Sequence, residues 1–309
     1  TDRDSGAGLA FAPEALKKAG AKAAVYLETN AIQLTPVGSD ALLPGGSAQL
    51  RVQIINNGAA KATALTASLT TSSPYVTITQ PTSTYPTVFP ASTATNPTPF
   101  AFTVAATTPC GEKLPLTLTI NYIGVGTHPA VLQLAVQVGR LGALTVTSYS
   151  GAPVAIPDGI LTGVDIPFTV AATSPIANVR FSFDGTACST LAGSTTVGVD
   201  HTWVGDLAFT LKSPSGTTVT LLDAAGGPNN NGHNFCQTVL DDAAPTSIQS
   251  VTPAQAPFTG TFAPANPLAA FAGESPAGTW TLHVSDSFPA DGGFVRAFSL
   301  ATSGFDCTP

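Results

Sequence analysis

Apolar and polar residues alternate along most of the chain after about residue 25, the pattern of strands that bury one face. Residues 49–55 show this alternation, and Asn56-Asn57-Gly58 then supplies a turn that favours positive φ. Further strands are expected at residues 64–69, 76–78, 100–104, 114–122 and 131–138. Residues 80–99 are rich in Thr and Pro and are expected to form a loop. This spacing predicts a β-sandwich over residues 25–139.

A second series of alternating segments begins near Thr147. Residues 201–222 are typical of a β-hairpin, because two alternating runs flank the turn sequence Ser213-Pro214-Ser215-Gly216. Other strand-like segments lie at 234–242, 257–262, 278–286 and 291–300. Residues 140–151 are expected to form a linker, with pairing of part of it as a strand left open, and 152–309 are expected to form a second β-domain.

A helix is expected only near the N-terminus. Pro13 occupies a first-turn position, residues 14–19 continue the helix, and Gly20 ends it. The fold class expected is therefore all-β, with one short N-terminal helix.

Composition supports this fold class. Charged residues make up 9% of the 309 residues, and 29 Gly and 26 Pro exclude long helices. The net charge of −7 disfavours a nucleic-acid partner, and no apolar run reaches the ~18 residues that a membrane span needs. The sequence has no Met, which favours a processed product or a piece of a longer chain.

The four cysteines are even in number and lack metal-binding spacing, which favours disulfides and a secreted protein. Cys188 and Cys236 are expected to pair, because both lie in loops of the same half. Cys110 and Cys307 would then form an interdomain bridge or remain free thiols. Four buried, reduced cysteines are the alternative.

Two segments of the first half resemble known families. Thr1–Leu9 carries "RDSGAG" before a helix, which resembles the closing segment of a subtilisin-like serine protease catalytic domain; residues 1–24 would be its tail. Leu43–Ser47 and Val52–Gly58 resemble the bacterial immunoglobulin-like modules appended to secreted enzymes. The resemblance implies an immunoglobulin-like sandwich over residues 25–139, with a spacing role.

The second half resembles the P domain, also called the Homo B domain. The runs that carry this resemblance are "HTWVGDLAFTLKSPSGTTVTLL" at 201–222 and "GTWTLHVSD" at 278–286. The family follows the catalytic domain in proprotein convertases and in many secreted bacterial proteases. The resemblance implies an eight-stranded jelly roll. Trp203 and Trp280 lie on alternating segments. They are expected to be core residues in the first place and ligand-binding platforms only in the second.

No protease machinery is recognisable in the sequence. The subtilisin-type nucleophile motif Gly-Thr-Ser and the metalloprotease motif HExxH are both absent. The four histidines lack a triad context, and His201 and His283 are expected to be structural. The chain itself is therefore expected to be inactive.

Calcium is the cofactor expected, because hard cations prefer oxygen ligands in loops at sheet ends. The candidate ligands are carboxylates of the second half: Asp206, Asp241, Asp242, Asp286 and Asp291. Bacterial P domains often bind calcium, which favours this hypothesis. Asp241 and Asp242 would point to opposite faces of a strand, so at most one of them would be a ligand. Solvated turn carboxylates are the alternative.

The function that these resemblances imply is that of the non-catalytic C-terminal region of a secreted bacterial subtilisin-like serine protease. The region would stabilise the protease and position a substrate or partner; its partners would be its own catalytic domain and a protein or polymer substrate. The alternative is an extracellular module that attaches a serine or metalloprotease to a polymer or cell surface. Exposed aromatic residues would favour this alternative, with Tyr75, Tyr85, Phe89 and Tyr122 as candidates.

Overall fold

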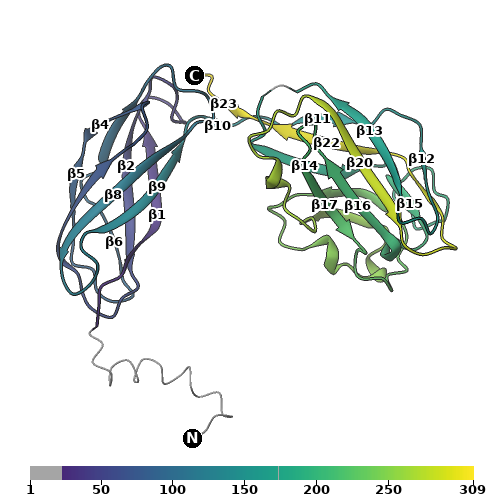
Figure 1. Ribbon diagram of the computed structural model, residues 1–309, viewed down its shortest axis with the longest axis horizontal. Helices are drawn as coiled ribbons and strands as arrows, with labels where there is room; N and C mark the ends of the chain where they lie inside the picture. The colour runs from purple at the N-terminus through teal and green to yellow at the C-terminus, as the bar shows by residue number, and fades with distance from the viewer. Residues whose placement is uncertain (1–22, 173) are drawn as a thin grey trace, which may run out of the picture. The chain divides into compact units, whose positions relative to one another are not determined.

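The computed structural model describes residues 23–172 and 174–309 (Figure 1). The helix expected at residues 13–19 and the protease-like segment before it lie outside the described residues. The chain divides into two compact units. The N-terminal unit comprises the described part of Thr1–Arg140 together with Cys307–Pro309, and the C-terminal unit is Leu141–Asp306. Both units are all-β.

The N-terminal unit is a sandwich of two sheets. One sheet has the order β1-β2-β7-β4, with β6 paired to β2, and the other has the order β5-β3-β8-β9. The strands are β1 (Leu27–Pro36), β2 (Ser47–Asn56), β3 (Thr63–Thr70), β4 (Val76–Gln80), β5 (Thr82–Tyr85), β6 (Thr93–Thr95), β7 (Phe100–Val104), β8 (Lys113–Ile123) and β9 (Ala130–Gln137). The alternation seen in the sequence places Leu50, Val52 and Ile54 of β2 in the core.

The segment 80–99 differs from the expected loop, because it contains β5 and β6. Ser83 and Tyr85 alternate inward from β5, and the Tyr85 hydroxyl donates to the Val52 carbonyl at 3.0 Å. The Ser83 hydroxyl donates to the Thr98 carbonyl at 2.7 Å. Hydrogen bonds therefore allow polar side chains to occupy buried positions that the hydrophobic pattern did not mark.

The C-terminal unit is also built from two sheets. One has eight strands in the order β11-β22-β14-β18-β15-β21-β12, with β19 paired to β18, and the other has the order β13-β20-β16-β17. The strands are β11 (Thr145–Ser148), β12 (Val154–Ile156), β13 (Val164–Val170), β14 (Asn178–Phe183), β15 (Val199–His201), β16 (Leu207–Lys212), β17 (Thr218–Asp223), β18 (Phe235–Leu240), β19 (Phe258–Phe262), β20 (Gly278–Asp286), β21 (Gly293–Val295) and β22 (Phe298–Ser303). The hairpin expected at 201–222 is β16–β17, which pair antiparallel.

Aromatic rings fill the core of the C-terminal unit. Phe183 contacts both Phe209 and Phe235, with ring centroids 4.8 and 5.3 Å apart. Trp280, from β20, is fully buried and meets Phe271 edge to face at 4.9 Å. Aromatic rings from both sheets thus meet in the core of this unit, among many aliphatic side chains.

Part of the segment expected as a linker, residues 140–151, pairs as a strand. Residues 145–148 form β11, which pairs with β22 inside the C-terminal unit. The chain crosses between the units a second time after Asp306, because Cys307 belongs to the N-terminal unit and is joined to Cys110 by a disulfide. The short strands β10 (Arg140–Leu141) and β23 (Phe305–Asp306), from the two crossings, pair with each other.

Limited proteolysis tests this double connection. A single cut at residues 142–144, between β10 and β11, should leave both fragments joined through Cys110–Cys307. We expect one band on a non-reducing gel and two bands after reduction. Two bands without reductant would contradict the connection.

Candidate functional site

The five aspartates considered as calcium ligands occupy two separate places. Asp241 follows β18 and forms an ion pair with Arg180, whose Nε lies 2.7 Å from Oδ2 of the carboxylate. Asp242 accepts hydrogen bonds from the backbone N–H groups of Leu268 and Ala269 at 2.8 and 2.7 Å, where the short 3-10 helix η4 (Leu268–Phe271) begins. Both carboxylates therefore have structural partners.

The other three aspartates gather at the opposite end of β18. Asp286 ends β20, and its Oδ2 lies 3.2 Å from Nε2 of His201; both side chains are fully buried. Oδ1 of Asp286 accepts from the backbone N–H of Phe288 at 3.1 Å. Asp291 accepts from the Thr202 hydroxyl. His201 is therefore a structural histidine, as the sequence led us to expect.

Asp206 is the unusual member of this group. The residue is only 5% exposed, yet no described residue donates a hydrogen bond to its carboxylate. The pKa of Asp206 is raised to about 6, first by burial and then by the negative charges of Asp286 and Asp291, whereas His201 acts in the opposite direction. Perturbed carboxyl groups of this kind are concentrated at functional sites.

The backbone around Asp206 is held on both sides. Asp206 ends the 3-10 helix η1 (Val204–Asp206), and its carbonyl accepts from both the N–H and the hydroxyl of Ser287 at 2.9 Å. Gly205 donates to the Asn230 carbonyl at 3.0 Å, and a Cβ at this glycine would lie 2.6 Å from the Gly227 carbonyl oxygen. Only glycine fits so close to the neighbouring backbone, so the turn that carries Asp206 is preorganised.

A pocket of about 440 Å³ opens over Asp206. Its lining consists of Trp203, Asp206, Pro228, Asn229, Phe288, Pro289 and Asp291. The Trp203 indole N–H donates to the Pro228 carbonyl at 3.0 Å, and Phe288 is 54% exposed. Trp203 therefore forms a wall of the pocket, contrary to the expectation that it is a core residue, whereas Trp280 is in the core. The irregular turn before β16 explains this difference, because it interrupts the alternation.

The donor set around Asp206 does not form a dedicated metal site. The described residues contain no group of three or more His, Cys, Asp or Glu side chains placed to hold one ion. Asp286 and Asp291 already accept hydrogen bonds, and Asp241 and Asp242 lie at the other end of β18. A calcium ion here would have to take most of its oxygen ligands from the backbone, amides or water.

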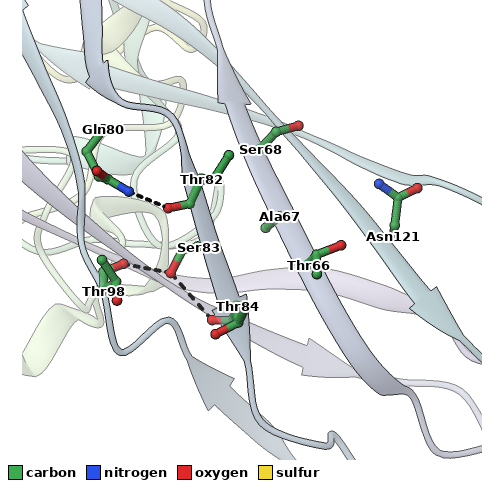
Figure 2. Close-up of a pocket in the computed structure, with 9 residues that line it drawn as sticks. All are labelled: Thr66, Ala67, Ser68, Gln80, Thr82, Ser83, Thr84, Thr98 and Asn121. Carbon is green, nitrogen blue, oxygen red and sulfur yellow. Dashed lines mark hydrogen bonds between the residues drawn. The ribbon is translucent and has the colours of Figure 1, made fainter.

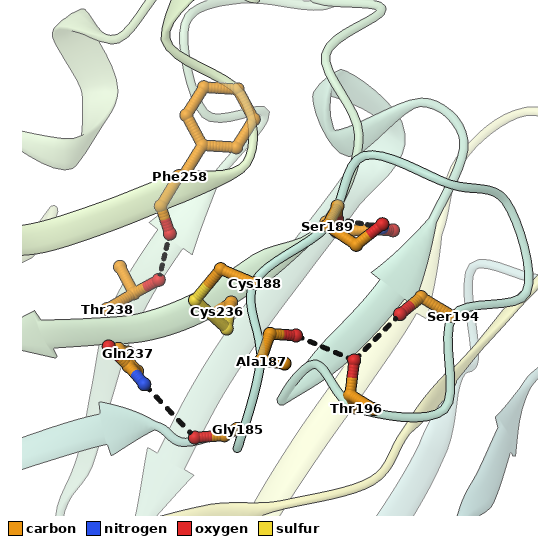
Figure 3. The surroundings of a disulfide bond; sticks show 11 residues. Gly185, Ala187, Cys188, Ser189, Ser194, Thr196, Cys236, Gln237, Thr238 and Phe258 are labelled. Carbon is orange, nitrogen blue, oxygen red and sulfur yellow. Dashed lines mark hydrogen bonds between the residues drawn. A yellow bond between two sulfur atoms is a disulfide. The ribbon is translucent and has the colours of Figure 1, made fainter.

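The Cys188–Cys236 disulfide fixes a loop beside the eight-stranded sheet, as Figure 3 shows. The bond joins the β14–β15 connection to the fully buried Cys236 of β18. Within the loop, the Thr196 hydroxyl donates to the Ala187 carbonyl at 2.6 Å. The structure thus contains both cysteine pairs considered in the sequence, and Cys110–Cys307 joins parts of the N-terminal unit.

The described histidines do not form a nucleophile–base pair. His283 lies 2.7 Å from the Asp165 carboxylate, and His128 and His233 contact backbone carbonyls. No hydrogen bond between a described histidine and a serine, threonine or cysteine side chain is present in these contacts. A hydrolytic triad would need such a contact.

A second hollow, on the N-terminal unit, is lined by uncharged side chains (Figure 2). Thr66 and Ser68 of β3, Thr82 and Thr84 of β5, and Asn121 of β8 line a volume of about 530 Å³. It contains neither an aromatic ring nor a charge. Hydroxyl groups alone provide little binding energy in water, so this hollow is a weaker candidate than the Asp206 pocket.

The aromatic residues inspected as a polymer-binding platform do not share one exposed face. Tyr85 and Tyr122 are buried, and Tyr75 packs against the core. Phe89 is exposed. Within the described residues, no helix is long and apolar enough to span a membrane.

The raised pKa of Asp206 predicts a stabilising substitution. A carboxyl group whose pKa rises from 3.8 to about 6 on folding stabilises the fold when protonated, and this contribution is lost as pH rises from about 4 to 6. Asp206→Asn keeps the neutral shape at every pH. After allowance for screening in an open pocket, we expect the variant to gain about 1–2 kcal/mol at pH 7 and nothing at pH 4.

Urea unfolding followed by tryptophan fluorescence measures this difference, because both tryptophans lie in the C-terminal unit. Asp242→Asn is the matched control: its carboxylate caps η4, so the substitution should not stabilise the unit at either pH. If Asp206→Asn raised the free energy of unfolding equally at pH 7 and pH 4, the stabilisation could not be due to removal of the ionised carboxylate.

Comparison with known proteins points to proteases. The chain is 27% identical over 176 residues to the "Calcium-dependent protease" of Trichormus variabilis and to that of a Nostoc species, covering 52% of this chain and 21% of each relative. The chain thus spans about a fifth of the length of these relatives.

Among solved structures, a serine protease of Aeromonas sobria matches at 20% identity and a TM-score of 0.32, covering 53% of this chain and 27% of that one. The secreted serine protease VesC from Vibrio cholerae matches at 11% identity and a TM-score of 0.25, covering 97% and 54%. Residues 193–302, within the C-terminal unit, match the family model of the proprotein convertase P-domain.

Proposed function

We propose that the chain is the non-catalytic C-terminal region of a secreted subtilisin-like serine protease, in which it stabilises the catalytic domain. The observation that carries this proposal is the P-domain match at residues 193–302, together with curated relatives that are proteases several times longer than the matched segment. The "RDSGAG" segment at the N-terminus supports the subtilisin-like parent. Two disulfides support an oxidising, extracellular location.

The physical basis of the stabilisation would be burial of part of the catalytic domain's surface. A rigid partner that binds only the folded catalytic domain shifts its unfolding equilibrium toward the native state. Both units are closed sandwiches with buried cores and could serve as such rigid surfaces.

The test compares the parent protease with and without residues 141–306. We expect the truncated enzyme to lose casein-hydrolysing activity several-fold faster at elevated temperature, while the chain of residues 1–309 alone does not hydrolyse casein. Equal inactivation rates would overturn the stabilising role. Inhibitor-sensitive hydrolysis by the homogeneous chain would overturn the non-catalytic assignment.

Calcium binding is a separate proposal for this chain. Its support is the name of the curated relatives and the closeness of Asp286 and Asp291 to Asp206, whose pKa their negative charges raise. The described side chains do not supply a three-ligand site, so no part of the proposed function depends on calcium. Attachment of the protease to a polymer or cell surface stays an alternative. The aromatic residues inspected in the N-terminal unit do not favour it, because they do not share one exposed face.

A further inference from the structure

We propose that the pocket over Asp206 binds the side chain of a lysine or arginine presented by a partner protein. The inference rests on the residues of the C-terminal unit alone and does not depend on the proposed role in a protease. The argument starts from the carboxylate that the fold leaves without a donor.

The Asp206 carboxylate lines the pocket and has no hydrogen-bond donor among the described residues. The residue is 95% buried, since only 5% of it is exposed, and its carboxylate receives no hydrogen bond from any described residue. An ionised carboxylate in this state costs free energy unless a positive charge or a donor approaches it. The pocket is the open side of the residue, so the missing partner must enter from there.

The walls of the pocket suit an organic cation. Trp203 and Phe288 supply aromatic rings and Pro228 and Pro289 supply apolar surface, while Asp206 and Asp291 supply negative charge. Lysine and arginine carry a charged head on an apolar stem, and aromatic faces attract such heads. A volume of about 440 Å³ accommodates a long side chain, whereas a single ion would leave most of it unfilled.

The surroundings favour a cation that belongs to a protein. The turn after β12 packs against the turn that carries Phe288: the Asp158 carboxylate accepts from the Ala290 N–H at 3.0 Å, and Gly159 lies beside Pro289. Ile160 and Leu161 follow in that turn and are 48% and 73% exposed. Protein interfaces combine an apolar surface with polar contacts. The exposed side chains of Ile160 and Leu161 beside the acidic pocket provide both, which favours a protein as the partner.

Tryptophan fluorescence can report binding directly. The chain has two tryptophans; Trp280 is fully buried, and Trp203 lines the pocket. The probes are N-acetyl-lysine methylamide and N-acetyl-arginine methylamide, titrated at constant ionic strength. N-acetyl-norleucine methylamide is the uncharged control.

At pH 8 we expect a saturable fluorescence change with a dissociation constant of about 1–10 mM for at least one cationic probe, the range for a single side chain in a preformed pocket. The norleucine probe should bind at least 10-fold more weakly. Asp206→Asn should weaken binding of the cationic probe at least 10-fold, and Asp242→Asn, at the far end of β18, should leave it unchanged. Lowering the pH to 5 should weaken binding of the cationic probe to the wild-type protein, because Asp206 then becomes neutral. The other titratable groups that act on Asp206 are His201, Asp286 and Asp291.

Three results would overturn the proposal. The first is no response of the wild-type protein to either cationic probe up to 50 mM. The second is equal binding to the wild-type protein and to Asp206→Asn, with near-ultraviolet circular dichroism confirming that the variant is folded. The third is a saturable response to calcium chloride after EGTA treatment that Asp206→Asn abolishes, without a response to the organic cations; this result would assign the pocket to a metal ion.

Discussion

Replacement of Arg296 by methionine should lower the free energy of unfolding of the C-terminal unit by about 3–5 kcal/mol. Asp200 is 2% exposed, and its carboxylate accepts from Nε and Nη2 of Arg296, both at 3.1 Å, and from the Phe294 N–H at 2.9 Å. The guanidinium also lies 4.7 Å from the centre of the Phe294 ring. Methionine fills similar space but leaves a buried negative charge without its cation.

Urea unfolding monitored by tryptophan fluorescence measures this loss in the C-terminal unit alone, because that unit contains both tryptophans. The double variant Asp200→Asn/Arg296→Met should recover part of the loss, since it removes the stranded charge as well. A cost below about 1 kcal/mol for Arg296→Met would show that water reaches Asp200 and that the pair contributes no more than a surface ion pair.

Removal of the Cys188–Cys236 bond should cost the same unit about 4 kcal/mol. The two cysteines are 48 residues apart in sequence, and opening a loop of that length increases the entropy of the unfolded chain by an amount of this order. The variant Cys188→Ala/Cys236→Ala avoids a buried free thiol. Its unfolding midpoint in urea, compared with that of the oxidised wild-type protein, measures the effect.

Ser189→Ala is the matched control, because this half-buried residue adjoins the bond without taking part in it. Its effect should stay within about 0.5 kcal/mol. If the double alanine variant were as stable as the wild-type protein, the β14–β15 loop would already be ordered in the unfolded ensemble or held by contacts such as that of Thr196 with Ala187.

The strands were largely predictable because their signal is local. Alternation over a few residues marks both the strand and its buried face, and it placed residues 100–104 at the bounds of β7. The signal failed for β5, where Ser83 is buried through a hydrogen bond to the Thr98 carbonyl. It failed again at Trp203, where a 3-10 turn replaces the strand.

The candidate site was predictable only in part. Asp206 drew attention because a carboxylate between apolar residues is unusual, and in the structure it is 5% exposed and has no donor among the described residues. The separation of Asp241 from Asp206 depends on the direction of β18 and could not be inferred from composition. The contact of His201 with Asp286 joins residues 85 apart in sequence, which no local pattern reveals.

The return of the chain to the N-terminal unit has a mechanical consequence. In the oxidised protein, tension applied between the two ends passes from Cys110 directly to Cys307, because the disulfide bypasses residues 111–306. The whole C-terminal unit, with the residues similar to a P-domain and the Asp206 pocket, lies inside this bypassed loop and carries none of the end-to-end load. Reduction of this single bond places the C-terminal unit in series with the pulling force, so the redox state of Cys110 and Cys307 determines whether that unit bears load.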